Sequence, residues 1–175
     1  MSLEHARALA RSARGRAKVV AVTVDPDDEL ADRIVEALRP DLLQLHGAES
    51  LERTRDIALR TGTPVIKALS IASPADLDAA AAYEGVADHL MFEPRPPVDA
   101  DRPGGHGRAL PFELLSERRF LRPWFLAGGL DPWNVRHAMS VSGAPLADVS
   151  SGVERGPGLK DPALIRAFLH AVRPA

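Results

Sequence analysis

Two glycine-bearing turns near the end of the sequence have the residue types that bind an anion through backbone amides. Gly128 and Gly129 follow the apolar run 124–127. The segment Ser150-Ser151-Gly152 begins at the last residue of the predicted strand 146–150. Glycine lets the backbone approach a ligand closely, and free N–H groups at helix starts favour negative charge. The spacing therefore indicates a phosphate site. The alternative is a pair of tight turns that bind nothing.

Two carboxylates stand where they could transfer a proton. Glu93 comes directly after the apolar run 89–92, where it is a candidate general acid or base or, alternatively, an exposed loop residue. Asp148 lies inside the predicted strand 146–150, and a buried carboxylate is costly unless it is hydrogen-bonded or functional. Both carboxylates are therefore candidates for a functional role.

Further polar residues lie at the ends of earlier runs. Gln44 and His46 close the run 42–45, and strand alternation points both side chains to one face. Lys67, in the run 64–69, either reaches the same rim or is an edge residue whose ammonium extends into water. The glycine-rich stretch 104–107 is a lid, an anion-binding nest of N–H groups or a plain surface loop.

No metal site is expected. The chain contains no cysteine, which excludes disulfides and thiolate chemistry. The remaining histidines show no metal-ligand spacing; they are His5, His89, His106, His137 and His170.

These residues are positioned by short apolar runs that alternate with segments of helical period. The predicted strands are 19–24, 42–45, 64–69, 89–92, 124–127 and 146–150. Helices are predicted between them, after the last one, and at 3–14. Three of the helix starts place a capping side chain before proline; they are Ser73-Pro74, Asp131-Pro132 and Asp161-Pro162.

One leading helix and six strand–helix units predict an α/β protein with a parallel sheet in a single domain over residues 1–175. The sheet is either open and doubly wound, or a (β/α)₈ barrel that lacks its first units, since a barrel needs eight strands.

The chain has 22 Lys and Arg against 24 Asp and Glu, and this net charge of −2 gives no drive toward nucleic acid or membrane. Its charged first residues are not a signal peptide, and we expect a cytoplasmic protein.

The motifs, taken in order, resemble phosphoribosylanthranilate isomerase, a tryptophan-pathway enzyme with a TIM (β/α)₈ barrel. The likeness covers essentially the whole chain; it rests on the segments 44–47, 103–107, 127–135, 148–154 and 156–161. It implies an Amadori rearrangement of N-(5-phosphoribosyl)anthranilate to 1-(2-carboxyphenylamino)-1-deoxyribulose 5-phosphate, without a cofactor or metal.

The resemblance also implies a role for each site residue. Glu93 occupies the position of the family's general-acid aspartate, which protonates the ribose ring oxygen. Gln44, His46, Gly104, Gly105 and Asp148 would bind substrate, with the loop 104–107 closing over it. Gly128, Gly129, Ser150, Ser151 and Gly152 would hold the phosphate.

The chain departs from the family pattern in two ways. Alignment of the chain with the family implies that the family's first βαβ segment is missing here, together with the cysteine that serves as the family's general base. In addition, Glu93 is one methylene longer than aspartate, and a shift of roughly 1 Å can slow a reaction about 10²-fold. Removing strands also exposes sheet edges, so we expect a longer product, self-association or a partner that covers them.

Three hypotheses remain open. The first is an isomerase whose N-terminal segment lies outside this sequence. The second is a catalytically dead homologue that binds phosphosugar or a partner protein. The third is another phosphosugar enzyme on the same barrel, for which a metal site or a lysine array would be expected.

Overall fold

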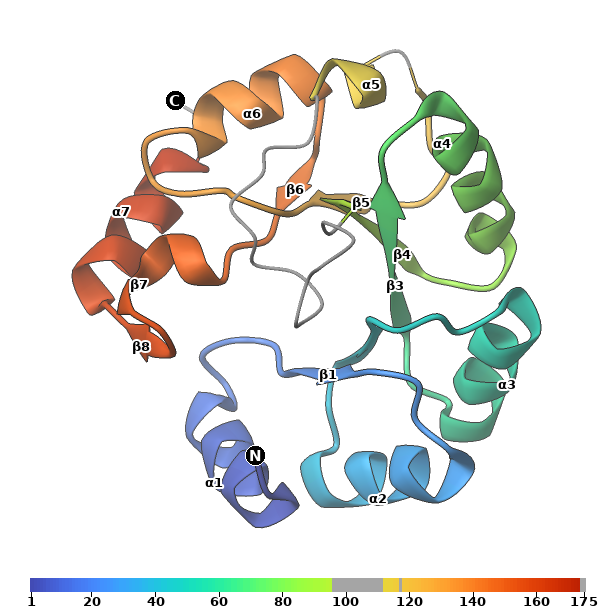
Figure 1. Ribbon diagram of the computed structural model, residues 1–175. Helices are drawn as coiled ribbons and strands as arrows, with labels where there is room; N and C mark the ends of the chain where they lie inside the picture. Colours follow the sequence, from blue (N-terminus) through green and yellow to red (C-terminus); the bar gives the residue numbers. More distant parts are fainter. Residues whose placement is uncertain (96–111, 117, 174–175) are drawn as a thin grey trace. The chain divides into compact units, whose positions relative to one another are not determined.

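The computed structural model describes residues 1–95, 112–116 and 118–173. The chain divides into two compact units, one formed by Met1–Ala68 and Ala82–Leu90, the other by Leu69–Ala81 and Met91–Ala175. The strands of a six-stranded sheet are in the order β1-β2-β3-β4-β5-β6, and the pairs β1–β2, β2–β3 and β5–β6 are parallel. Strands alternate with helices along the chain, as expected for an α/β fold (Figure 1).

The first unit contains the beginning of the sheet and the helices that connect its strands. Its elements are α1 (Leu3–Ala13), β1 (Val20–Thr23), α2 (Asp28–Leu38), β2 (Leu42–Leu45), α3 (Leu51–Thr61), the start of β3 (Val65–Ile71), the 3₁₀ helix η1 (Ala82–Gly85) and the start of β4 (His89–Pro94). The helix ends are set locally. Asp27 caps α2 by accepting from the amide of Leu30 at 2.8 Å, and Ser50 caps α3 by accepting from Arg53 at 3.1 Å.

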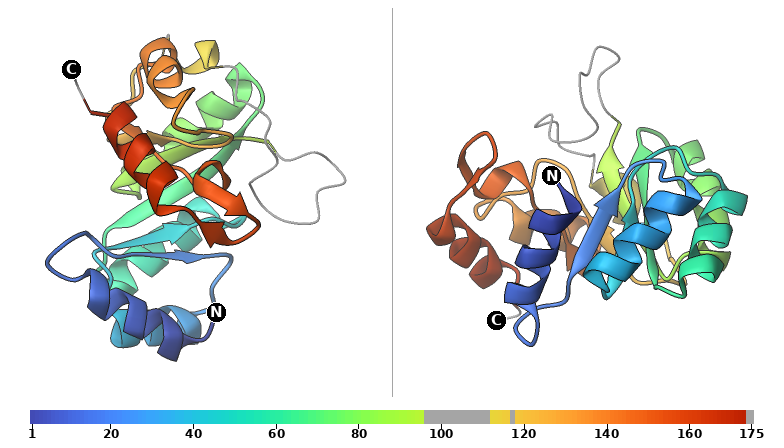
Figure 2. Two further views of the ribbon diagram at one scale, coloured as in Figure 1. Left: turned by 90° about the vertical axis from the view of Figure 1, so that its left-hand side faces the viewer. Right: turned by 90° about the horizontal axis from the view of Figure 1, so that it is seen from below.

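Burial in this unit is uneven, and it corrects one expectation. All four residues of β2 are buried, whereas β1 alternates, with Val20 40% and Val22 61% exposed. The run 19–24, whose β-branched residues favour a buried strand, therefore forms an edge strand with one exposed row of side chains. Beside it, residues of α1, β1 and α2 line an apolar groove of about 580 Å³. Figure 2 shows α1 and α2 next to one another beside β1.

The second unit contains the end of the sheet. Its further elements are α4 (Pro74–Ala81), α5 (Glu113–Ser116), β5 (Trp124–Leu126), α6 (Val135–Ser142), β6 (Leu146–Ala147), η2 (Ser151–Val153), β7 (Glu154–Gly156), β8 (Leu159–Lys160) and α7 (Pro162–Ala171). Phe92, Phe120 and Trp124 pack together, with ring centroids 4.7 to 5.6 Å apart. This cluster packs the β4 residue just before Glu93 against β5.

Several element boundaries in this unit differ from those predicted, and one hairpin was not predicted at all. β4 extends to Pro94, so Glu93 belongs to the strand instead of following it. β6 ends at Ala147, so Asp148 lies after the strand and is half-buried, not buried within it. The helix expected from Pro132 begins at Val135, because residues 132–134 form turns that the Asp131 carboxylate caps. The antiparallel hairpin β7–β8, beside α7 in Figure 1, was not predicted.

Candidate active site

In the second unit, the predicted residues Glu93, Gly128 and Gly129 lie where β4 and β5 end. The amide of Ala127 donates to the Phe92 carbonyl at 2.8 Å, which joins the two strands beside Glu93. Glu93 is 7% exposed. Gly128 has φ +88°, and a Cβ there would lie 2.1 Å from Cδ of Pro94. A side chain at position 128 would therefore collide with the residue that follows the candidate acid.

The turn after β5 is held by its own side chains. The Asp131 carboxylate accepts from the amides of Trp133 and Asn134, both at 2.8 Å. The Asn134 amide group in return accepts from the Asp131 amide and donates to the Gly129 carbonyl, both at 2.9 Å. These bonds fix the Gly128–Gly129 segment, so that a ligand meets an ordered backbone.

The turn after β6 packs directly on the turn after β5. A Cβ on Gly152 would lie 1.9 Å from the Leu130 carbonyl oxygen, so only glycine fits there. Ser150 and Ser151 are exposed beside it, and the Asp148 amide donates to the Leu126 carbonyl at 2.8 Å. The two turns predicted to bind phosphate are thus adjacent, as a shared anion site requires.

Lys160 also reaches the second turn, and the sequence analysis assigned it no role. Its ammonium donates to the carbonyl oxygen of Ser150 at 2.8 Å and forms an ion pair with Glu154 at 2.7 Å. The β7–β8 hairpin places Lys160 there, so the missed hairpin is the reason that the contact was missed.

In the first unit, Gln44 and His46 lie at the end of β2. Gln44 is 6% exposed and His46 half-buried, and the Gln44 amide nitrogen lies 2.8 Å from Nδ1 of His46. The backbone of His46 donates to the Thr23 carbonyl at 2.8 Å, which ties it to β1. The two side chains that strand alternation placed together are therefore in contact.

Lys67 reaches the end of β2 beside His46, which agrees with the first of its two predicted settings, but it is not an edge residue whose ammonium extends into water. It is 2% exposed and forms an ion pair with Glu49, a residue that no pattern in the sequence singled out. Burial by itself raises the pKa of Glu49, but the hydrogen bond and charge of Lys67, with the amides of Asp25 and Glu49, outweigh it and lower this pKa. A lysine inside an apolar run is the signal that could have prompted a search for an acidic partner.

The remaining predictions concern other residues. Gly104 and Gly105, with the rest of 104–107, lie outside the described residues. Within the described ranges, no cluster of three or more His, Asp or Glu could hold a metal ion. In the same part of the chain, no helix is both long and apolar enough to cross a membrane.

A parallel α/β sheet with polar groups and glycine turns at its strand ends defines the class of ligand-binding α/β proteins. A family model for N-(5′-phosphoribosyl)anthranilate (PRA) isomerase matches residues 1–171. The chain therefore belongs to the N-(5′-phosphoribosyl)anthranilate isomerase family.

Individual relatives agree with this assignment. The chain is 60% identical over 173 residues to the N-(5′-phosphoribosyl)anthranilate isomerase of Caulobacter vibrioides, covering 98% of this chain and 79% of that protein. The phosphoribosylanthranilate isomerase structure of Thermotoga maritima is similar with a TM-score of 0.85 and 31% identity, over 98% of this chain and 80% of that one. A second similar structure, a complex of phosphoribosylanthranilate isomerase with reduced 1-(o-carboxyphenylamino)-1-deoxyribulose 5-phosphate, has a TM-score of 0.81 and 30% identity, over 98% of this chain and 79% of that one.

Proposed function

We propose that the chain works as a phosphoribosylanthranilate isomerase in tryptophan biosynthesis. The observation that carries the proposal is the close packing of Gly152 on the Leu130 carbonyl, which brings the turns after β5 and β6 together. Family membership supplies the substrate, N-(5-phosphoribosyl)anthranilate. A small phosphorylated sugar suits adjacent turns whose backbone amides can bind an anion.

We propose that Gly128, Gly129, Ser150, Ser151 and Gly152 bind the substrate's phosphate. In the same proposal Gln44, His46, Asp148, Gly104 and Gly105 bind the rest of the substrate. No cofactor is required, because an Amadori rearrangement only moves protons and an electron pair within one molecule.

Glu93 is the general acid in this proposal. Its carboxyl group gives a proton to the ribose ring oxygen, the bond from that oxygen to C1′ breaks, and the anilino nitrogen supplies the electron pair that forms a double bond to C1′. Loss of the proton on C2′ then gives a neutral enol, and addition of a proton at C1′ with loss of the 2′-hydroxyl proton gives the ketone. General acid catalysis of this kind contributes about 10²–10⁴-fold.

A further part of the proposal concerns the complete fold and the base that removes the C2′ proton. The family resemblance implies a cysteine, and this chain has none. We propose that one further βαβ segment, covering the β1 edge, completes a single (β/α)₈ barrel domain and carries the base. Support comes from the exposed Val20 and Val22, and from the apolar groove beside them.

That segment can be supplied as a separate chain with the family's sequence. We expect it to bind this chain and to raise turnover of N-(5-phosphoribosyl)anthranilate. Unchanged turnover and unchanged sedimentation would contradict the proposal. Dimerisation of the chain by itself would show instead that a second copy covers the edge.

Two matched variants test the function. In the completed enzyme, Glu93→Gln should lower kcat about 10²–10⁴-fold while largely keeping the affinity for the reduced product analogue. Gly152→Ala should have the reverse pattern and lose affinity, whereas Gly156→Ala, where a Cβ has ordinary room, serves as the control. Unchanged kcat in Glu93→Gln removes Glu93 from the mechanism. Binding without any turnover in the unsubstituted protein would favour the catalytically dead alternative.

A further inference from the structure

The ion pair between Lys67 and Glu49 is buried and has no part in the proposed proton transfers. Nζ of Lys67 lies 2.8 Å from Oε2 of Glu49, and the two side chains are 3% and 1% exposed. Taking two charges out of water is costly, and well-packed apolar residues often stabilise a fold as well or better. The pair therefore calls for a role other than stability, and its other contacts indicate one.

Lys67 holds the carbonyl groups of the turn between β2 and α3. Its ammonium donates to the carbonyl oxygens of Leu45 at 3.3 Å and Gly47 at 2.8 Å, and to that of Ala68 at 3.0 Å. Leu45 and Gly47 are the two neighbours of His46. The lysine thus fixes the chain on both sides of the histidine.

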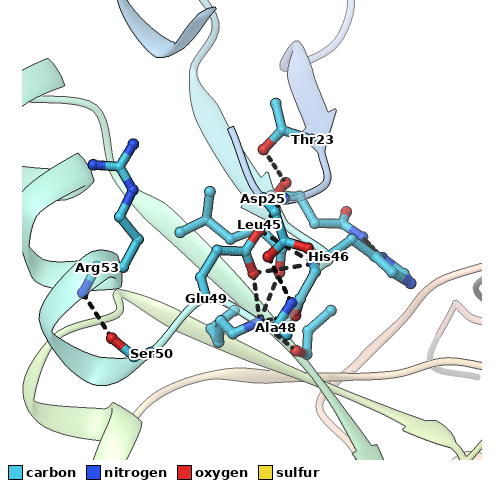
Figure 3. A network of polar contacts seen from close by, with 12 residues as sticks. Thr23, Asp25, Leu45, His46, Ala48, Glu49, Ser50 and Arg53 are labelled. Carbon is cyan, nitrogen blue, oxygen red and sulfur yellow. Dashed lines mark hydrogen bonds and ion pairs between the residues drawn. The ribbon is translucent and has the colours of Figure 1, made fainter. Parts of the chain in front are cut away.

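Glu49 holds the amide groups of the same turn. Its carboxylate accepts from the Gly47 amide at 3.0 Å and from the Asp25 amide, at the end of β1, at 2.9 Å. Its backbone carbonyl accepts from the Tyr83 hydroxyl at 3.0 Å. Figure 3 shows Glu49 next to Asp25 and His46 in this network.

The turn between β2 and α3 is packed tightly against the end of β1. The Ala48 amide donates to the Asp25 carboxylate at 2.8 Å, and Asp25 itself adopts φ +44°. A Cβ on Gly47 would lie 2.5 Å from that carboxylate. Any drift of the turn would therefore break bonds to β1 and to β3 together.

We infer that Glu49 and Lys67 are positioning residues, which fix the backbone on either side of His46 and so orient the imidazole and Gln44 toward substrate. This inference rests on the proposed function, since it takes His46 and Gln44 as substrate-binding residues. Gln44 is included because its side-chain amide contacts His46 at 2.8 Å.

The test measures binding of the reduced product analogue by calorimetry. Glu49→Gln keeps the shape of the side chain but removes its charge, and Lys67→Met removes the ammonium and its four hydrogen bonds. We expect each variant to bind about 10- to 100-fold more weakly, as displaced binding groups do. Arg60→Met is the control, because Arg60 lies on α3 and its guanidinium forms exposed ion pairs with Asp28 at 3.0 Å and Asp32 at 2.6 Å.

A double-variant cycle separates positioning from a general loss of structure. If Glu49 acts through His46, then Glu49→Gln should weaken binding little further in a His46→Ala background. Losses that add in full would overturn the inference. Should Lys67→Met fail to fold, Glu49→Gln carries the same cycle, with circular dichroism as the check of folding.

Failure of the inference and failure of the proposed function give different results. If the unsubstituted chain does not bind the analogue, or if His46→Ala binds it equally well, the proposed substrate site is wrong and the inference falls with it. If the chain binds, His46→Ala weakens binding and Glu49→Gln does not, the inference alone is overturned.

Discussion

Gly128 and Pro94 are packed so closely that no larger residue fits at position 128. A Cβ there would lie 2.1 Å from Cδ and 2.8 Å from Cγ of the proline ring, and φ of Gly128 is +88°. Pro94 follows Glu93 in the chain, so the contact ties the turn after β5 to the end of the strand that carries the candidate acid.

Replacing Gly128 by alanine should therefore damage both stability and catalysis. The left-handed backbone and the overpacking together should lower the free energy of unfolding by about 2–4 kcal/mol, and a moved Glu93 should lower kcat. Thermal denaturation and steady-state assays of N-(5-phosphoribosyl)anthranilate turnover measure the two effects. Gly156→Ala is the control, and a Gly128→Ala variant with the stability and kcat of that control would contradict the prediction.

The Glu49–Lys67 pair predicts how stability depends on pH. Because the folded-state pKa of Glu49 lies below its ordinary value of 4.5, its stabilisation is present above that value and is lost as the pH falls below it. In the Lys67→Met variant, the ammonium no longer opposes the burial that raises the pKa of Glu49. The buried Glu49 carboxylate should therefore destabilise the fold increasingly as the pH rises.

The difference in thermal midpoint between the unsubstituted chain and Lys67→Met should accordingly shrink as the pH falls from 8 toward 4. Taking a difference removes the titration of other acids. Burial and the charges of Glu49 and Glu52 raise the pKa of Tyr83, so this residue stays neutral throughout. A difference that is constant with pH would show that Glu49 is not titrating against Lys67.

Thr54 offers a substitution that should stabilise the protein. It is 0% exposed on α3, and its hydroxyl oxygen has no hydrogen-bond partner among the described residues. Thr54→Val removes an unsatisfied polar group at equal shape and should raise the free energy of unfolding by about 1 kcal/mol.

A second threonine of the same helix supplies the control. The Thr61 hydroxyl donates to the Ile57 carbonyl at 2.8 Å, so Thr61→Val should lower stability where Thr54→Val raises it. Urea denaturation of both variants measures the two changes. The prediction fails if Thr54→Val is destabilised as much as Thr61→Val.

The sequence predicted the order of strands and helices, because short β-branched or apolar runs and proline-capped helix starts are local signals. It also predicted that Gly128 and Gly152 lie in turns that bind a ligand, since both residues follow runs that are recognisable as strands in the sequence. It left open whether Lys67 reaches the end of β2 or extends into water, and it overlooked Glu49, because their pairing depends on how β2 and β3 are registered. Likewise, Val20 and Val22 look like core residues until the strand is known to lie at an edge.

The aromatic cluster of Phe92, Phe120 and Trp124 gives the protein a built-in optical reporter. Trp124 is 6% exposed within that cluster, whereas Trp133, the only other tryptophan, is 78% exposed on the turn that Asp131 caps. Their fluorescence should differ in emission wavelength and in quenching by acrylamide. A Trp133→Phe variant would then give a single-tryptophan signal from the interior beside Glu93, and a Trp124→Phe variant a signal from the rim, so that loosening of the two places can be followed separately in one spectrometer.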